Sequence, residues 1–327
     1  MDRALVAAIV VATAFNFTNG VHDAADAVAT LVATRTAQAG AALAVAVVFT
    51  LLGPLVLGAA VADTVGKVVE VPQSQIVAVI GAGVSGALVW NLFSWWRGLP
   101  SSSTHALIGG LVGAALAADG IHAVGWSTVG LVLAALVLSP ALGFAAGFVG
   151  TRGARFGLRR ATLAVERPIR GGQWVSSAVL AFAHGANDAA KATGVIVVML
   201  VATQHATSTS APLWVTLLAT TSLALGTAVG GWRIVRTIGM GIFRLRPLDG
   251  LVSQTGSAVV VLGASALGAP VSTSQVLASS VAGVGSGQRW HHVHWHVVRN
   301  IGVAWLVTVP VCVMLGALAL PLWRWVT

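Results

Sequence analysis

Long apolar segments, separated by short polar stretches, alternate along the whole chain. Four uninterrupted apolar segments cover residues 40–62, 75–96, 126–150 and 213–232. Each is long enough for a helix to cross a hydrocarbon core of about 30 Å, which takes about 20 residues. The pattern therefore predicts an all-α polytopic membrane protein.

Two polar motifs lie inside the apolar pattern, and each occurs twice. Residues 19–26 read Asn-Gly-Val-His-Asp-Ala-Ala-Asp, and residues 184–191 read His-Gly-Ala-Asn-Asp-Ala-Ala-Lys. Residues 100–105 read Pro-Ser-Ser-Ser-Thr-His, and residues 270–275 read Pro-Val-Ser-Thr-Ser-Gln. The offsets, 184 − 19 = 165 and 270 − 100 = 170, differ by five residues, as expected for a duplicated unit with small loop insertions.

The polar motifs are predicted to break the helices that contain them. We expect a helix over 4–34 interrupted around 16–26, and a second broken helix over 174–201. Pro100 and Pro270 are each followed by hydroxyl residues, a pattern typical of a helix start. Irregular backbone is tolerated at membrane depth only where protein buries it or a cavity wets it, so re-entrant helical hairpins are expected there. Paired breaks in two halves indicate a transporter site near the midplane, in a chain of about 10–12 helical segments.

Composition and charge exclude a soluble protein and a nucleic-acid-binding one. Charged residues make up 8% of the chain, against about 25% in soluble domains. The net charge is +9, but its arginines gather in residues 152–170 and 233–246, which positive-inside topology places in the cytoplasm. The expected units are an N-terminal transmembrane repeat over 1–150, a basic cytoplasmic linker over 151–173 and a C-terminal transmembrane repeat over 174–327.

Asp23 and Asp188 occupy equivalent positions in the two copies of the first motif. Hard cations take oxygen ligands, so we expect these carboxylates to bind a coupling ion, as Na⁺ ligands if Na⁺ is that ion. Capping of a broken helix is the structural alternative. Asn19 and Asn187 either donate hydrogen bonds to phosphate or bind the cation, and the sequence leaves both roles open.

The second motif supplies hydroxyl groups without fixed charge. A helix N-terminus with free N–H groups and hydroxyls is an anion site, and uncharged donors bind an oxyanion reversibly. Ordinary helix caps and small packing residues are the alternative. The candidate substrate ligands are Ser101, Ser102, Ser103, Thr104, Ser272, Thr273 and Ser274.

Asp26 and Lys191 hold the same position of the repeat, 191 − 26 = 165, with opposite charges. We expect an ion pair or a proton-linked couple between them, because pairing offsets part of the cost of burying either charge. Protonation of Asp26 during transport would then favour coupling to H⁺. The alternative is that Asp26 is one more cation ligand.

Histidines in the motifs are candidate proton relays or ordinary hydrogen-bonding residues. His22 is the candidate for ion coupling, and His105 and His184 share both interpretations. The stretch 291–296 contains four histidines, two of them four residues apart on a predicted helix, but no nearby Asp, Glu or Cys completes a metal site. Gln254 is a further, weakly supported contact for ion or substrate, and Arg35 is an interfacial anchor or a counter-charge for an anion.

These motifs resemble those of the inorganic phosphate transporter (PiT) family. The similarity covers Asn19–Ala27, His184–Lys191, Pro100–Gly109, Pro270–Gln275 and the phrase Gly230–Gly239, in order and over nearly the whole chain. It implies symport of inorganic phosphate with Na⁺ or H⁺, two inverted repeats and a homodimer. By the same resemblance, the Ser and Thr residues hold phosphate and the Asn and Asp residues hold the coupling ions. The sequence departs from the family pattern at Asp26, Ala190 and Gln275.

The expected function is therefore secondary active import of phosphate by alternating access in the cytoplasmic (inner) membrane. A sulfate or metal–phosphate permease of the same fold is the main alternative, and an anion channel is a second one. No metalloprotease helix, nucleophile elbow or nucleotide-binding loop occurs in the sequence, so neither an enzyme nor an ATP-driven pump is expected. The expected partners are phosphate, membrane lipid and a second copy of the chain, with no cofactor beyond the coupling ion.

Overall fold

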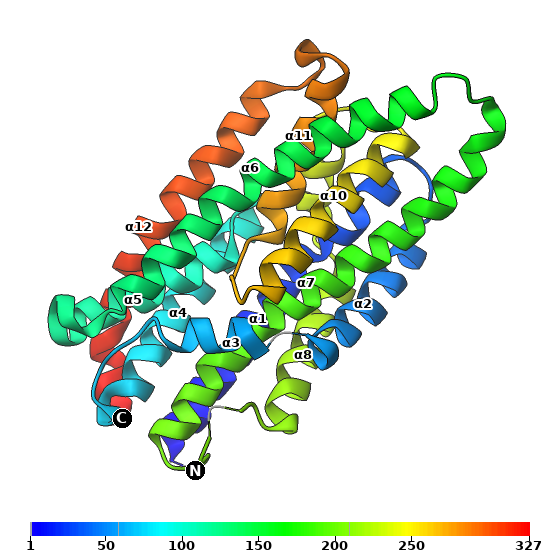
Figure 1. Ribbon diagram of the computed structural model, residues 1–327. Helices are drawn as coiled ribbons and strands as arrows, with labels where there is room; N and C mark the ends of the chain where they lie inside the picture. The colour runs from blue at the N-terminus through cyan, green and yellow to red at the C-terminus, as the bar shows by residue number, and fades with distance from the viewer. Residues whose placement is uncertain (1, 58, 209) are drawn as a thin grey trace.

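Helices account for nearly all of residues 2–57, 59–208 and 210–327, which a computed structural model describes (Figure 1). This part of the chain forms twelve α-helices and no β-strand, in agreement with the predicted class and number of segments. Three 3₁₀ turns, η1 (Gly120–Ala123), η2 (Leu163–Val165) and η4 (Trp290–His292), and one π-helical turn, η3 (Thr237–Gly241), lie between them. The α-helices are α1 (Arg3–Ala33), α2 (Ala39–Val56), α3 (Ala59–Gly66), α4 (Gln73–Arg97), α5 (Ser103–Asp119), α6 (Trp126–Gly157), α7 (Glu166–Ala202), α8 (Leu213–Val229), α9 (Trp232–Arg236), α10 (Pro247–Ala266), α11 (Thr273–Gln288) and α12 (Trp295–Val326).

The protein is a multi-pass membrane protein by the length and hydropathy of its helices. Among the described residues, seven helices are long and apolar enough to span a bilayer, and an eighth span results if α8 and the α9–η3 segment, bent by 62°, count as one. The outer helices α6 and α12 expose large apolar side chains such as Val137 and Leu306. Such a surface is suited to lipid and not to water.

Two helical hairpins carry the hydroxyl-rich motifs. Helix α4 ends at Gly98, whose φ of 67° needs a glycine, and α5 begins at Ser103 after Pro100. In the second half, Gly268 has a φ of 71° between α10 and α11, and α11 begins three residues after Pro270. The predicted helix starts at both prolines are confirmed.

The predicted breaks in α1 and α7 are wrong, because both helices run without interruption through their polar motifs. Neither motif contains a proline, and its polar side chains bond to other helices instead of to their own backbone. The glycines of the motifs serve close packing: a Cβ at Gly20 would lie 2.0 Å from the Leu223 carbonyl oxygen, and one at Gly185 would lie 2.3 Å from that of Thr50. The motifs therefore mark helix contacts and a buried site, not a change of backbone conformation.

Helices of each half of the chain pack on helices of the other half. Helix α2 packs on α7 and α8 packs on α1, while α12 packs on the α4–α5 hairpin and α6 packs on the α10–α11 hairpin. Figure 1 shows α1 and α7 running in opposite directions through the centre of the bundle. Each contact between a helix of one half and a helix of the other has a counterpart in which the two halves are interchanged, as two inverted repeats would give. The division of the chain at 151–173 stays a prediction; α6 and α7 extend into that range from both sides.

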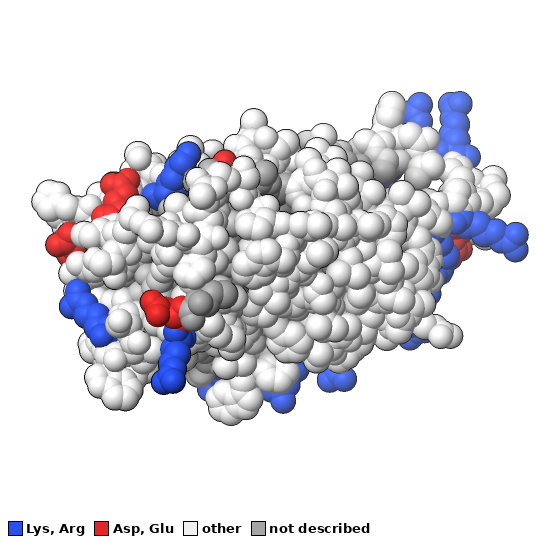
Figure 2. All heavy atoms as spheres, turned by 90° about the horizontal axis from the view of Figure 1, so that it is seen from below, with Lys and Arg blue, Asp and Glu red and all other residues white. Residues whose placement is uncertain are grey.

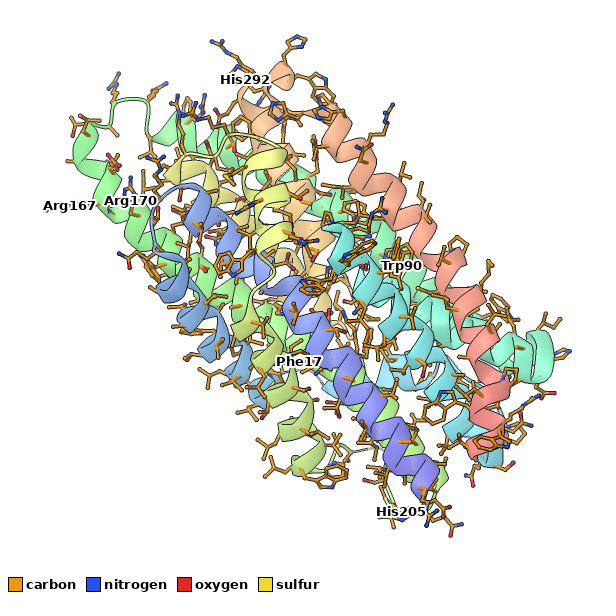
Figure 3. All side chains as sticks on the ribbon, turned by 180° about the vertical axis from the view of Figure 1, so that it is seen from behind. Phe17, Trp90, Arg167, Arg170, His205 and His292 are labelled. Atoms are coloured by element: carbon orange, nitrogen blue, oxygen red, sulfur yellow. The ribbon has the colours of Figure 1, made fainter. Side chains whose placement is uncertain are left out.

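Basic side chains gather at one end of the bundle. Figure 2 shows a broad uncharged band with a cluster of Lys and Arg at one end and mixed charges at the other. Arg167, Arg170 and His292 lie at the basic end in Figure 3, and His205 lies at the opposite end. Both termini lie at the end away from the arginine-rich α6–α7 turn (Figure 1).

Candidate functional site

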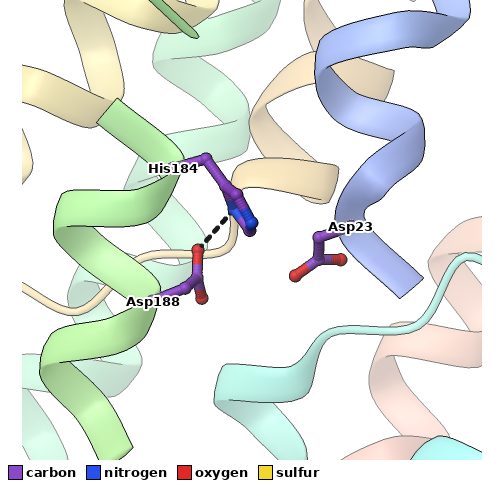
Figure 4. A group of neighbouring side chains, drawn as sticks. All are labelled: Asp23, His184 and Asp188. Carbon is purple, nitrogen blue, oxygen red and sulfur yellow. Dashed lines mark ion pairs between the residues drawn. The ribbon is translucent and has the colours of Figure 1, made fainter. Parts of the chain in front are cut away.

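A cluster of ionisable groups lies where α1 and α7 pack side by side at the centre of the bundle. Asp23 of α1 and His184 and Asp188 of α7 are buried, and one ligand atom of each lies within 4.8 Å of the others (Figure 4). His184 Nδ1 is 2.8 Å from Asp188 Oδ2. The structure thus brings together Asp23 and Asp188, the two carboxylates that the repeat placed at equivalent positions.

Lys191 is fully buried with its ammonium in a cage of oxygen atoms. Its Nζ donates to the Asp188 carboxylate, to Thr104 Oγ1 at 2.5 Å and to the Val271 carbonyl oxygen at 3.1 Å. The predicted ion pair with Asp26 is wrong: among the described residues Lys191 pairs with Asp188. The reason is that Asp188 and Lys191 are three residues apart on one helix and face the same side.

A second cluster of oxygen atoms, around Asp26, is the counterpart of this cage in the other repeat. The Ser274 Oγ atom is 2.7 Å from Asp23 Oδ1 and 3.0 Å from Asp26 Oδ2, and Ser103 Oγ lies 3.5 Å from Asp23 Oδ2. A hydroxyl has one hydrogen and can donate to only one carboxylate at a time. Asp23 has a second donor in Ser103, but two carboxylates this close repel each other, and a proton or a cation bound by the pair would relieve that repulsion. No Lys or Arg pairs with either carboxylate in the described chain.

The predicted hydroxyl residues divide into helix caps and groups that face α1 and α7. Ser102 and Ser272 accept the backbone N–H of the residue three positions on and cap α5 and α11. Ser101 donates to Ser94. The remaining four lie against the ionisable residues: Ser103 and Ser274 by the contacts above, Thr104 at Lys191, and Thr273, whose Oγ1 is 3.2 Å from His184 Nδ1.

His22 and Asn187, at equivalent positions of the repeats, each hold the hairpin of their own half. His22 Nε2 is 3.0 Å from Ser94 Oγ, on α4, and Asn187 donates to Ser265 Oγ, on α10, at 2.9 Å. The structure therefore does not bring His22 to the carboxylates. Neither serine was among the residues predicted from the sequence, although each stands shortly before the proline of its hairpin, at 100 − 94 = 6 and 270 − 265 = 5 residues.

Other candidates from the sequence lie outside the cluster. Gln254 accepts from Ser176 and donates to the Ala27 carbonyl, one turn from Asp23 and toward the basic end. The histidines of 291–296 form no metal-binding group in the described residues and lie at the basic end. His105 contacts Gln275 at 3.2 Å, so that the N-termini of α5 and α11 meet at equivalent positions.

Four buried polar atoms at the centre have no hydrogen-bond partner among the described residues. They belong to residues of α1, α7 and α11, and an unpaired buried polar group costs about 1–3 kcal/mol. Several unpaired buried polar atoms that lie together indicate that a bound ligand supplies their hydrogen-bond partners. The atoms are Asn19 Oδ1, Asp26 Oδ1, His184 Nε2 and Gln275 Oε1.

The charges of the site do not balance. Three carboxylates, of Asp23, Asp26 and Asp188, face one ammonium, that of Lys191, and the imidazoles of His184 and His105 lie near this group. An anion enters such a site only together with positive charge, because like charges at short range repel strongly where water is excluded. The geometry is therefore suited to binding an oxyanion jointly with protons or cations.

Comparison with known proteins gives one consistent result. The chain matches the family model described as "Phosphate transporter family" over residues 19–164 and 156–316. It is 39% identical to a Rhizobium meliloti protein named "Probable low-affinity inorganic phosphate transporter", over 96% of this chain and 95% of that one. A Bacillus subtilis protein of the same name is 36% identical over 98% of each chain. A solved structure, "The sodium-dependent phosphate transporter", has a TM-score of 0.89 and 25% identity and covers 99% of this chain and 100% of that chain.

Proposed function

The chain belongs to the phosphate transporter family, and from this premise we propose that it is a secondary transporter that imports inorganic phosphate in symport with protons. Family membership and the likeness of the fold support phosphate as the substrate. The central cluster, with its hydroxyl groups, helix N-termini and unpaired polar atoms, supports the position of the binding site.

Proton coupling rests on one observation, the position of Lys191. A carboxylate, a hydroxyl and a carbonyl at a helix end form a set of ligands that suits Na⁺ in transporters. Here the lysine ammonium occupies that cage, so a cation of the protein itself fills the position that Na⁺ would take. The positions left for an exchangeable cation are the Asp23 and Asp26 carboxylates, which share the Ser274 hydroxyl.

A proton on the Asp23–Asp26 pair explains how binding and release of phosphate would alternate. Protonation from the outside removes a negative charge and lets phosphate bind to Ser103, Thr273 and the ends of α5 and α11. When the site opens to the cytoplasm and the proton leaves, the carboxylates regain their charge and repel the anion. The ammonium of Lys191 stays in place throughout and supplies a constant attraction.

The unpaired acceptors favour phosphate over sulfate. Asn19 Oδ1 accepts hydrogen bonds and cannot donate them, and the same holds for Asp26 Oδ1 when the proton of the pair is on Asp23. A protonated phosphate has an O–H group to offer, whereas sulfate has none near neutral pH. A buried acceptor left unpaired disfavours the wrong substrate strongly.

The test is uptake of labelled phosphate into proteoliposomes, with an inward H⁺ gradient or an inward Na⁺ gradient imposed separately and with unlabelled sulfate as competitor. We expect uptake driven by H⁺ alone and unaffected by sulfate. Asp26→Asn should flatten its pH dependence, whereas Asp63→Asn, the same change at an exposed aspartate, should not. Uptake driven by Na⁺ alone would refute proton coupling, and sulfate transport without phosphate transport would refute the substrate.

A second candidate, symport of phosphate together with a divalent metal ion, is supported by the Asp23–His184–Asp188 group. Two carboxylates and one imidazole are ligands that divalent transition metals accept. The same vesicles distinguish it: phosphate uptake that stops in a chelator and resumes with Mn²⁺ or Zn²⁺ would favour the metal–phosphate complex. Unchanged uptake would leave free phosphate as the substrate.

A further inference from the structure

A large cavity opens at the basic end of the bundle, outside the central site. Its volume is about 1480 Å³, and it is lined by segments from α1, α6, the η3–α10 connection and the α11–η4 turn. Five arginines line it together with three histidines of residues 291–294. We call this cavity the arginine vestibule; its arginines are Arg35, Arg155, Arg244, Arg246 and Arg289.

The positive charge of the vestibule is only partly neutralised by the protein. No Asp or Glu lines the cavity, and none of its five arginines forms an ion pair in the described chain. Arg155 donates instead to the Gln288 side chain, at 2.5 Å. Asp249 is buried beside the cavity, but its carboxylate accepts from the Arg246 backbone N–H and from Gln288. The Asp249 charge offsets part of the charge of Arg155 and Arg246, so one carboxylate faces five guanidinium groups, and guanidinium groups bind phosphate oxygens in a bidentate manner.

Arg35 is held in the vestibule by an unfavourable backbone conformation. It follows the C-cap of α1 with a φ of 54°, in the left-handed region that glycine or asparagine usually occupies at this position. A residue with a Cβ atom pays roughly 1–2 kcal/mol there. Gln204, after α7, has the same conformation without lining this cavity, so the strain belongs to both helix ends and is not specific to the vestibule.

A row of polar groups leads from the central site to the vestibule along α1. The cavity begins at Ala29, one helical turn beyond Asp26. Between them, the Ala27 carbonyl accepts from Ser177 and Gln254, and the buried Thr30 hydroxyl has no partner. Thr34, one turn further, lines the cavity and donates to Gln173.

We propose that the arginine vestibule is a second anion site, which binds inorganic phosphate on its way from the central site to the cytoplasm. The inference rests on the proposed function for the source of its ligand. Phosphate held there repels the next ion to leave, so a high internal phosphate concentration slows uptake. The shared chemistry, a phosphate group on several guanidinium groups, also fits the head group of an anionic lipid, and the test separates the two sources.

The test uses the whole protein in nanodiscs of phosphatidylcholine and measures binding of labelled inorganic phosphate by equilibrium dialysis. We expect two classes of site in the wild type, and only the central class in Arg244→Gln/Arg246→Gln/Arg289→Gln. A matched control, Arg159→Gln/Arg160→Gln/Arg167→Gln, removes the same charge from the same end without touching the cavity and should keep both classes. Only the vestibule class should weaken steeply as KCl is raised, because exposed charges are screened by salt.

Uptake by proteoliposomes preloaded with phosphate is the second readout. Internal phosphate should inhibit the wild type and the control several-fold more than the vestibule variant. Equal phosphate binding by the vestibule variant and the wild type would overturn the proposal. Loss of the vestibule class in nanodiscs that contain phosphatidylglycerol, with its return when that lipid is omitted, would overturn free phosphate as the occupant and assign the site to lipid.

Two controls keep the outcome interpretable. If the triple variant does not fold, as judged by size-exclusion chromatography, the single change Arg35→Gly takes its place, because glycine suits the backbone there. Asp26→Asn separates the two proposals: it should flatten the pH dependence of uptake and remove its stimulation by an H⁺ gradient, and leave the vestibule class intact. Vestibule binding in a protein that transports no phosphate under any gradient would mean that the proposed function, and not the second site, is wrong.

Discussion

Lys191 is the residue on which the central site depends most directly, because it is a buried cation with one counter-charge, Asp188. Removing one partner of a buried ion pair leaves an uncompensated charge and costs about 3–5 kcal/mol. We expect Asp188→Asn to lower the thermal unfolding midpoint markedly and to abolish uptake. Asp188→Asn/Lys191→Met should regain much of the stability without regaining transport. A single variant as stable as the wild type would contradict the pairing.

The left-handed residues Arg35 and Gln204 allow a second test at this scale. Each follows the end of a long helix, α1 or α7, with a φ of 54° or 59°. Arg35→Gly should raise stability by about 1 kcal/mol, since the strain disappears, while phosphate binding in the vestibule falls. Gln204→Gly should raise stability similarly and leave binding unchanged. Thermal unfolding measures the stability of both variants, and equilibrium dialysis measures their phosphate binding. A fall in the stability of either variant would contradict backbone strain at that position.

The sequence predicted which residues lie together where the repeat supplied a reason, while their roles stay predictions. Asp23 and Asp188, at equivalent positions, meet at the centre, and three of the predicted hydroxyl residues, Ser103, Thr273 and Ser274, contact Asp23 or His184. It did not predict the partner of Lys191, because matching positions in two repeats do not determine which carboxylate lies nearest. Helical spacing within 188–191 contained that information. The Val271 carbonyl ligand was beyond prediction, since a backbone atom leaves no side-chain signal.

At the scale of helices, contacts between backbones decide how α1 is placed. Gly20 and Gly226 face each other across the α1–α8 contact, and a Cβ on either would meet a carbonyl oxygen at 2.0 Å. We expect Gly20→Ala to separate the two helices, lower the unfolding midpoint and reduce uptake. The matched change Gly130→Ala, in α6 where a Cβ meets nothing within 4 Å, should be neutral or stabilising. Equal effects of the two changes in a thermal unfolding assay would contradict this role.

The helix breaks show which element-scale features a sequence can reveal. Pro100 and Pro270 stop the backbone and were recognised correctly. The polar motifs of α1 and α7 gave a false signal, because polar side chains in an apolar run are also compatible with a straight helix whose neighbours supply the hydrogen bonds. Which helices are those neighbours depends on how the two halves of the chain pack on each other, and no local sequence pattern contains that information.

At the scale of the whole molecule, the distribution of charge predicts the orientation in the membrane. The arginine-rich end is expected in the cytoplasm, so both termini should lie outside. The only cysteine in the sequence, Cys312, is buried and should give little background. In intact cells, a membrane-impermeant maleimide should label Thr327→Cys and should label Gly157→Cys only after permeabilisation. The reverse pattern would place the arginine vestibule outside the cell.

The tethered ammonium in the oxygen cage has an electrical consequence. A cation that is part of the chain can shift within the membrane field but cannot be delivered to the other side. In a voltage-clamp recording, movement of Lys191 would appear only as a brief capacitive transient after a step in potential. The steady current would report only the ions that travel with phosphate. The charge of Lys191 would therefore be absent from the steady current although it is present in the site.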